Sequence, residues 1–155
     1  MQEIEHKFLV TSEDFKIEAF SKTKIIRAYL NSHEERTVRI RTRDQEAFIT
    51  IKGKTSDNGL SRFEWEKKID FKDALELLKL AEPGKIEKFR YEIRVGDHIF
   101  EVDEFLGDNA GLTIAEIELK SEEEYFEKPE WLGKEVSGDK RYYNSFLSKN
   151  PYKNW

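Results

Sequence analysis

The chain has 155 residues, with 27 Lys and Arg, 32 Asp and Glu, a net charge of −5 and no cysteine. This length predicts one domain over residues 1–155. The missing cysteines exclude disulfides, thiolate metal sites and cysteine nucleophiles, and the acidic balance argues against non-specific binding of nucleic acid or anionic membranes. The charged N-terminus and the lack of a long apolar run predict a cytoplasmic protein that does not enter the membrane.

Alternation of charged and apolar residues predicts eight β-strands, because successive strand side chains point to opposite faces. In chain order we expect them near residues 2–9, 25–31, 35–43, 46–53, 61–70, 86–95, 98–106 and 112–120. Turn residues at 57–59, 95–98 and 109–111 separate the strands and favour antiparallel neighbours. Helical patterns occupy the longer gaps, at 12–20, 72–80, 122–126 and 140–147. Ser121 and Glu124 have the spacing of a capping box for the third helix.

These elements predict an α+β fold in which an eight-stranded antiparallel β-barrel has a few short helices packed outside. One face of the strands is apolar, with Phe63 and Trp65 among its residues, and should pack against the helices. The other face is charged and would look into the barrel. Because burying unpaired charge is prohibitive, this interior must be hydrated or filled with counter-ions, so we expect an open tunnel.

The charged face carries acids and bases in same-sign pairs two residues apart. Its acids are Glu3, Glu5, Glu64, Glu66, Glu101, Asp103, Glu116 and Glu118, and its bases are Lys7, Arg39, Arg41, Lys52, Lys88, Arg90 and Arg94. A solvated sheet face is the simplest interpretation of alternation. Like charges along one strand repel, however, and gain from a ligand between them. Paired carboxylates suit a hard divalent cation and paired cations suit phosphate oxygens, which together describe a metal–polyphosphate site.

The same residues resemble the CYTH superfamily, the triphosphate tunnel metalloenzymes, whose signature Glu-x-Glu-x-Lys is matched by Glu3-Ile4-Glu5-His6-Lys7. The resemblance continues in the order of the family through Tyr29, Arg39-Ile40-Arg41, Lys52, Glu64-Trp65-Glu66, Lys88-Phe89-Arg90, Glu101-Val102-Asp103, Glu116-Ile117-Glu118 and Asp139-Lys140-Arg141-Tyr142. It covers roughly residues 1–147 and is strongest with the short bacterial members. It implies an eight-stranded tunnel that hydrolyses a triphosphate with Mg²⁺ or Mn²⁺, and inorganic tripolyphosphate is the expected substrate.

The resemblance also implies roles for individual residues. Glu5, Glu116 and Glu118 are the expected metal ligands, with Glu3 and Asp103 as nearby ligands or supporting residues. Lys7, Arg39, Arg41, Lys52, Lys88 and Arg90 would hold phosphate oxygens and offset charge during phosphoryl transfer, with Lys7 and Arg39 counted as catalytic. Glu64 and Glu66 would hold a second cation and the attacking water, and one of them would act as the base.

Two other classes of function remain open at this level. Within enzymes, a class IV-type adenylyl cyclase or a thiamine triphosphatase is the alternative, although no set of residues is dedicated to a purine or thiazolium ring. Outside enzymes, the same bases would let a non-catalytic protein capture polyphosphate, a nucleoside triphosphate or the 5′-triphosphate end of an RNA. The sequence leaves open Mg²⁺ against Mn²⁺, one metal against two, and whether the chain forms a homodimer.

Overall fold

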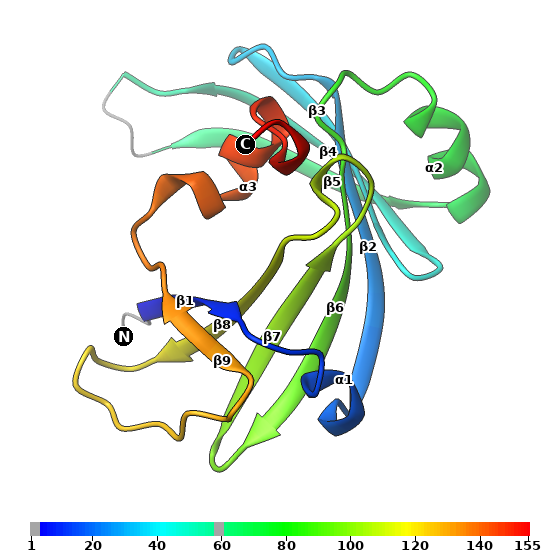
Figure 1. Ribbon diagram of the computed structural model, residues 1–155. Helices are drawn as coiled ribbons and strands as arrows, with labels where there is room; N and C mark the ends of the chain where they lie inside the picture. Colours follow the sequence, from blue (N-terminus) through cyan, green and yellow to red (C-terminus); the bar gives the residue numbers. More distant parts are fainter. Residues whose placement is uncertain (1–3, 58–60) are drawn as a thin grey trace. The chain divides into compact units, whose positions relative to one another are not determined.

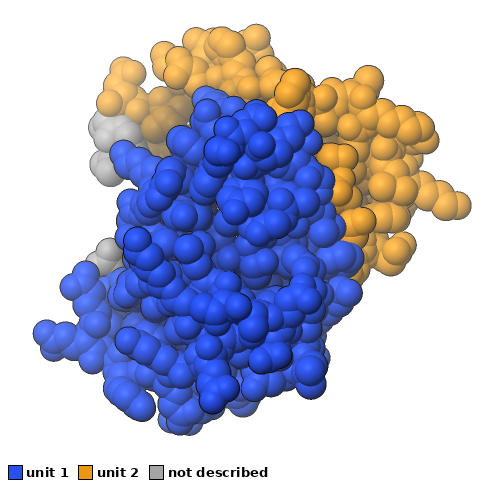
Figure 2. Space-filling model, in the orientation of Figure 1, with its two compact units in different colours: residues 1–23, 88–155 blue, residues 24–87 orange. Residues whose placement is uncertain are grey.

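The computed structural model describes residues 4–57 and 61–155 of the chain. Two compact units are distinguished, unit 1 with residues 1–23 and 88–155 and unit 2 with residues 24–87 (Figure 2). Each unit is a run of antiparallel strands with short helices, so the α+β class is confirmed (Figure 1). Within the described ranges, no helix is long and apolar enough to cross a bilayer.

All eight expected strands form, and a ninth follows them. The strands are β1 (Ile4–Val10), β2 (Ser21–Asn31), β3 (Arg36–Arg43), β4 (Glu46–Thr55), β5 (Arg62–Ile69), β6 (Ile86–Val95), β7 (His98–Phe105), β8 (Thr113–Leu119) and β9 (Leu132–Glu135). The helices are α1 (Phe15–Glu18), α2 (Phe71–Leu78) and α3 (Asn144–Lys149), with short 3-10 turns at Gly107–Asn109, Lys140–Tyr142 and Tyr152–Asn154.

Unit 1 contains strands in the order β6-β7-β8-β1-β9, with each described pairing antiparallel. Its apolar face is closed by an aromatic cluster. Trp131 lies edge-on to Phe15 and Phe100, with ring centroids 5.9 and 5.5 Å apart, and its indole Nε1 donates a 2.6 Å hydrogen bond to Glu18. These rings bury the side of the sheet opposite to the charges, so the charged side is left for a ligand.

Trp131→Phe should lower the free energy of unfolding by about 1–3 kcal/mol, because it removes both buried volume and the bond to Glu18. Urea unfolding followed by circular dichroism measures the loss. Trp65→Phe is the matched control, since Trp65 is 44% exposed and its replacement should change stability by less than about 0.5 kcal/mol. Equal losses of unfolding free energy in the two variants would contradict the packing of Trp131 against Phe15 and Phe100.

Unit 2 contains the strand order β5-β4-β3-β2. α2 covers one face of β3 and β4, where Ala74 packs on Ile40 and Ala47, and all three are fully buried (Figure 1). The spacing of Ala74, Leu77 and Leu78 places them on one side of the helix, which explains this contact. The expected burial of Phe63 and Trp65 is wrong, because they lie on the outermost strand, β5, and are 65% and 44% exposed.

The barrel prediction needs a correction. Within residues 4–57 and 61–155 the outer edges of β5 and β9 pair with no further strand, so the strand pairing forms an open sheet rather than a closed eight-stranded barrel. The ninth strand extends the sheet beyond β1, where closure would have begun. The predicted turn at 57–59 lies partly outside the described residues, since 58–60 are not described.

The helix expected at 122–126 does not form. Glu124 cannot cap a helix, because its carboxylate accepts from the Lys120 backbone N–H and bonds the His98 ring. Phe126 instead turns inward and packs on Phe8 and Phe100. The helix expected at 140–147 is interrupted at Tyr143, so a 3-10 turn and α3 replace it.

Candidate active site

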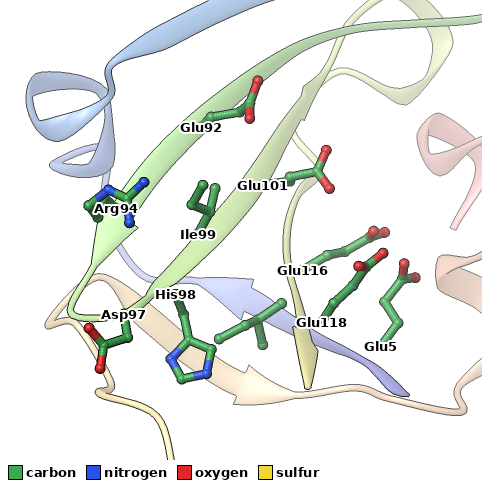
Figure 3. A pocket seen from close by; sticks show the side chains of 10 residues that line it. Glu5, Glu92, Arg94, Asp97, His98, Ile99, Glu101, Glu116 and Glu118 are labelled. Atoms are coloured by element: carbon green, nitrogen blue, oxygen red, sulfur yellow. The ribbon is translucent and has the colours of Figure 1, made fainter. Parts of the chain in front are cut away.

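Strands β7, β8 and β1 present one charged face in unit 1. The register places Glu101 opposite Glu116 and Glu116 opposite Lys7, and one step further Glu118 lies opposite Glu5. In Figure 3 the carboxylates of Glu5, Glu116 and Glu118 extend from the same side of the strands, with Glu101 beside them. These residues line a cavity of about 380 Å³, whose other charged residues are Glu92, Arg94 and Asp97.

Glu5 and Glu116 are crowded carboxylates. Burial, followed by the charge of Glu116 and a hydrogen bond to it, raises the pKa of Glu5, and the positive charge of Lys7 only partly offsets this. Hard divalent cations prefer such oxygen donors, so the pair fits Mg²⁺ or Mn²⁺. Among the described residues no group of three or more His, Asp and Glu side chains is already gathered to hold a metal. Glu3, an expected ligand, lies outside the described residues.

Asp103 occupies a different environment from Glu101, although both belong to β7. Its side chain is 4% exposed and binds Lys88 Nζ at 2.8 Å and Arg90 Nε at 2.8 Å. Burial opposes ionisation, but the hydrogen bond from Arg90 and the charges of Lys88 and Arg90 keep the pKa of Asp103 below its usual range. Both oxygens are therefore engaged, which argues against Asp103 as a metal ligand and makes Lys88 its buried counter-ion.

Lys7 points into a second cavity of unit 1, of about 330 Å³, which Glu5, Ser137, Gly138 and Tyr143 also line. Its ammonium lies 3.4 Å from Glu116 and 4.7 Å from the centre of the Tyr143 ring. The backbone of Lys7 is fixed by the segment after β9, because its N–H donates to Ser137 Oγ and its carbonyl accepts from the Val136 N–H. The Lys7 ammonium group is therefore held on the charged face, between Glu116 and the Tyr143 ring.

Unit 2 presents a face rich in cations. The register places Arg27 opposite Arg41 on β2 and β3, and Tyr29 opposite Arg39. The Nε atoms of Arg39 and Arg41 are buried and have no hydrogen-bond partner within the described ranges. Burial, then the charges of Arg27 and Arg41, lower the pKa of Arg39. A group of arginines with hydrogen-bond donors still open in this way fits a polyanion such as phosphate.

Neutral and acidic groups complete the unit 2 face. Burial would raise the pKa of Tyr29, but the hydrogen bond from Arg27 and the surrounding positive charges lower it overall. Thr50 donates a 2.7 Å hydrogen bond to Glu66, whose other oxygen is 3.9 Å from Arg41. Glu64 lies opposite Lys52 in the register of β4 and β5.

The structure groups the predicted residues by unit. In unit 1 it brings together Glu5, Lys7, Arg90, Glu101, Glu116 and Glu118, and in unit 2 Arg39, Arg41, Lys52, Glu64 and Glu66. Lys88 and Asp103 lie on the same side of their strands as Arg90 and Glu101, but both are buried. Arg27 and Thr50 were missed. Thr50 lies two residues from Lys52, a predicted face residue, and Arg27 lies two residues from Tyr29, which the family resemblance singled out, so the alternation would have found both.

Unit 1 thus carries a charged face with crowded carboxylates, and unit 2 carries one with several arginines. The family model that matches this chain is the CYTH domain, over residues 1–143. The chain therefore belongs to the CYTH domain family, as the sequence resemblance indicated.

The chain is similar over its whole length to two curated bacterial proteins and a solved structure. It is 44% identical over 156 residues to an inorganic triphosphatase of Acetivibrio thermocellus, covering 99% of this chain and 97% of that protein. It is 37% identical over 153 residues to an inorganic triphosphatase of Nitrosomonas europaea, covering 96% and 97%. A crystal structure of an inorganic triphosphatase matches with a TM-score of 0.79 and 31% identity, covering 96% of this chain and 95% of that one.

Proposed function

We propose that this protein is a divalent-metal-dependent inorganic triphosphatase, which hydrolyses tripolyphosphate and releases a terminal phosphate. The observation that carries the proposal is the pair of half-buried arginines, Arg39 and Arg41, whose Nε atoms are shielded from water and have no hydrogen-bond partner within the described ranges. Full-length relatives named inorganic triphosphatase support it. The tunnel implied by the sequence resemblance belongs to the same proposal and rests on membership of the CYTH domain family.

The cations of unit 2 bind the substrate in this proposal. Arg39 and Arg41 donate to phosphate oxygens through N–H groups that no described protein atom accepts, and Lys52 supplies a further charge from β4. Negative charge shifts between oxygens as the terminal phosphoryl group transfers, so fixed cations stabilise the transition state more than the ground state. Lys7 and Arg90 of unit 1 act on phosphate in the same way.

Glu5 and Glu116, with Glu118 beside them, hold the divalent cation in this proposal. A bound cation of this kind polarises phosphate oxygens and offsets their charge. Mg²⁺ and Mn²⁺ both suit carboxylate donors. Glu3 remains a proposed ligand, whereas Asp103 holds Arg90 through both of its oxygens instead of binding metal in this proposal.

Glu64 or Glu66 is the proposed base for the attacking water. Glu66 is held in place by the hydrogen bond from Thr50, while its second oxygen faces Arg41. A carboxylate anchored by one oxygen can orient a water with the other, which is the geometry that general-base catalysis requires. A second cation at these two glutamates is part of the same proposal.

The proposal is tested by measuring phosphate release from tripolyphosphate, thiamine triphosphate, ATP and pyrophosphate, each with Mg²⁺, Mn²⁺ or EDTA. We expect metal-dependent release from tripolyphosphate to exceed release from ATP and thiamine triphosphate, because the sequence shows no set of residues dedicated to a purine or thiazolium ring. Cyclic AMP from ATP would indicate a cyclase, and preference for thiamine triphosphate would indicate a thiamine triphosphatase. Strong binding of tripolyphosphate without release would overturn the enzymatic proposal in favour of a binding protein.

Domain and partner assignments are proposals of the same kind. The family match spans residues of both units, which supports one functional domain. The cysteine-free, acidic composition supports a cytoplasmic protein that does not bind membranes or bulk nucleic acid, with a triphosphate as its small-molecule partner. Gel filtration with light scattering would decide between a monomer and a homodimer.

A further inference from the structure

Two cations proposed to bind phosphate are already paired with carboxylates of the same face. Lys7 Nζ lies 3.4 Å from Glu116 Oε1, and Arg90 Nη1 lies 2.9 Å from Glu101 Oε2. Both pairs are largely shielded from water, with side-chain exposures between 16% and 36%. The Glu101 and Glu116 carboxylates also belong together, because they lie directly opposite each other on β7 and β8.

Arg90 is anchored independently of Glu101. Its Nε and Nη2 atoms both bind Asp103, at 2.8 and 3.0 Å, while only Nη1 reaches Glu101. If Glu101 turned away, the bidentate contact with buried Asp103 would keep the guanidinium plane where it is. The Nη1 group would then face the ligand without any movement of Arg90.

Lys7 is anchored in a comparable way. Its backbone is bonded to Ser137 and Val136, and the Tyr143 ring lies under its ammonium group. Loss of Glu116 as a partner would therefore leave the Lys7 ammonium on the same face, with hydrogen-bond donors free for an anion.

We propose that Glu101 and Glu116 are shared carboxylates, which neutralise Arg90 and Lys7 in the metal-free protein and bind the divalent cation when it is present. Glu101 thereby becomes a further metal ligand beside Glu5 and Glu116, in place of Asp103. Metal binding frees the two anchored cations for the triphosphate, so the two binding events reinforce each other. This inference rests on the proposed triphosphatase function, but it is tested by binding alone and does not depend on turnover.

The first test titrates Mn²⁺ into metal-free protein, without any phosphate, by isothermal titration calorimetry. In Lys7→Met, Glu116 has no ion pair to break before it binds the metal. Mn²⁺ should therefore bind about fivefold more tightly than in the unaltered protein. Lys16→Met is the matched control, because Lys16 forms a 2.7 Å ion pair with Glu104. Glu104 differs from Glu101 by an odd number of positions on β7 and so projects from the opposite face. Lys16→Met removes the same charge and should change the affinity by less than about twofold. Equal effects of the two changes, or no tightening in Lys7→Met, would overturn the sharing of Glu116.

The second test replaces Glu101 and measures two ligands separately. Glu101→Gln should weaken Mn²⁺ binding by about tenfold, because a ligand is lost. The same variant should bind tripolyphosphate in EDTA more tightly than the unaltered protein, because Arg90 has lost its competitor. Glu104→Gln removes the same charge from β7 and should shift neither affinity. Unchanged Mn²⁺ affinity in Glu101→Gln, or weaker tripolyphosphate binding in EDTA, would show that Glu101 only supports the fold. Circular dichroism checks that each variant is folded.

Discussion

Replacing Arg39 by methionine is expected to lower kcat/KM for tripolyphosphate by at least about a hundredfold, because a fixed cation at the transferring phosphate is removed. The fold should survive the change. Burial and the charges of Arg27 and Arg41 lower the pKa of Arg39, so the charged guanidinium of Arg39 reduces the free energy of unfolding. Removing it should leave the free energy of unfolding unchanged or raise it. Phosphate release with Mg²⁺ and urea unfolding measure the two effects.

Arg36→Met is the matched control for this experiment. Arg36 is exposed at the start of β3 and differs from Arg39 by an odd number of positions, so it projects from the opposite face. The control should retain most of the activity. Full activity in Arg39→Met, or a loss of activity that parallels unfolding, would contradict the proposed role of Arg39 in binding phosphate.

The alternation of residues along the strands predicts much of the charged face. The two-residue spacing of Arg39 and Arg41 places both side chains on the same side of β3. Such positions depend only on the period of an extended chain, which is a local property. The strands and the two groups of like charges could therefore be predicted without knowledge of the fold.

The difference between Glu101 and Asp103 could not be predicted from the same pattern. Both are acids on the same side of β7, but Asp103 is placed against Lys88 and Arg90 by the pairing of β6 with β7. Burial depends on what covers each end of a strand, and alternation carries no information about that. The sequence pattern left Asp103 as either a metal ligand or a supporting residue, and only the structure shows its bonds to Lys88 and Arg90.

Near residues 121–135 the sequence analysis predicted a helix that does not form and missed β9, for a related reason. A capping-box spacing at Ser121 and Glu124 favours a helix locally, but His98 from β7 bonds Glu124 and the Phe126 ring enters the aromatic cluster. Tertiary contacts of this kind override local preference. β9 has only four residues, too few for a reliable alternation signal, and it forms because β1 offers it an edge.

Asp103→Asn should lower the free energy of unfolding at pH 7 by about 3–5 kcal/mol, because it removes the charge that Lys88 is buried against and one of the two carboxylates that pair with Arg90. The effect should depend on pH in a defined direction. The pKa of Asp103 is lowered by folding, so its contribution to stability is complete above the usual aspartate range and is lost as the pH falls through the lowered pKa. The difference between the unaltered protein and the variant should therefore shrink in acid. Urea unfolding at several pH values measures it.

Glu104→Gln separates this effect from the loss of any ion pair on β7. Glu104 pairs with Lys16, but both side chains are between a quarter and a third exposed, and such pairs contribute less than about 1 kcal/mol. A loss in Asp103→Asn no larger than that in Glu104→Gln, or one independent of pH, would contradict the buried anchor. A large loss that fades in acid would instead show that the ionised Asp103 carboxylate stabilises Lys88 and Arg90. Such an anchor would keep the Arg90 guanidinium in place when Glu101 moves away from it.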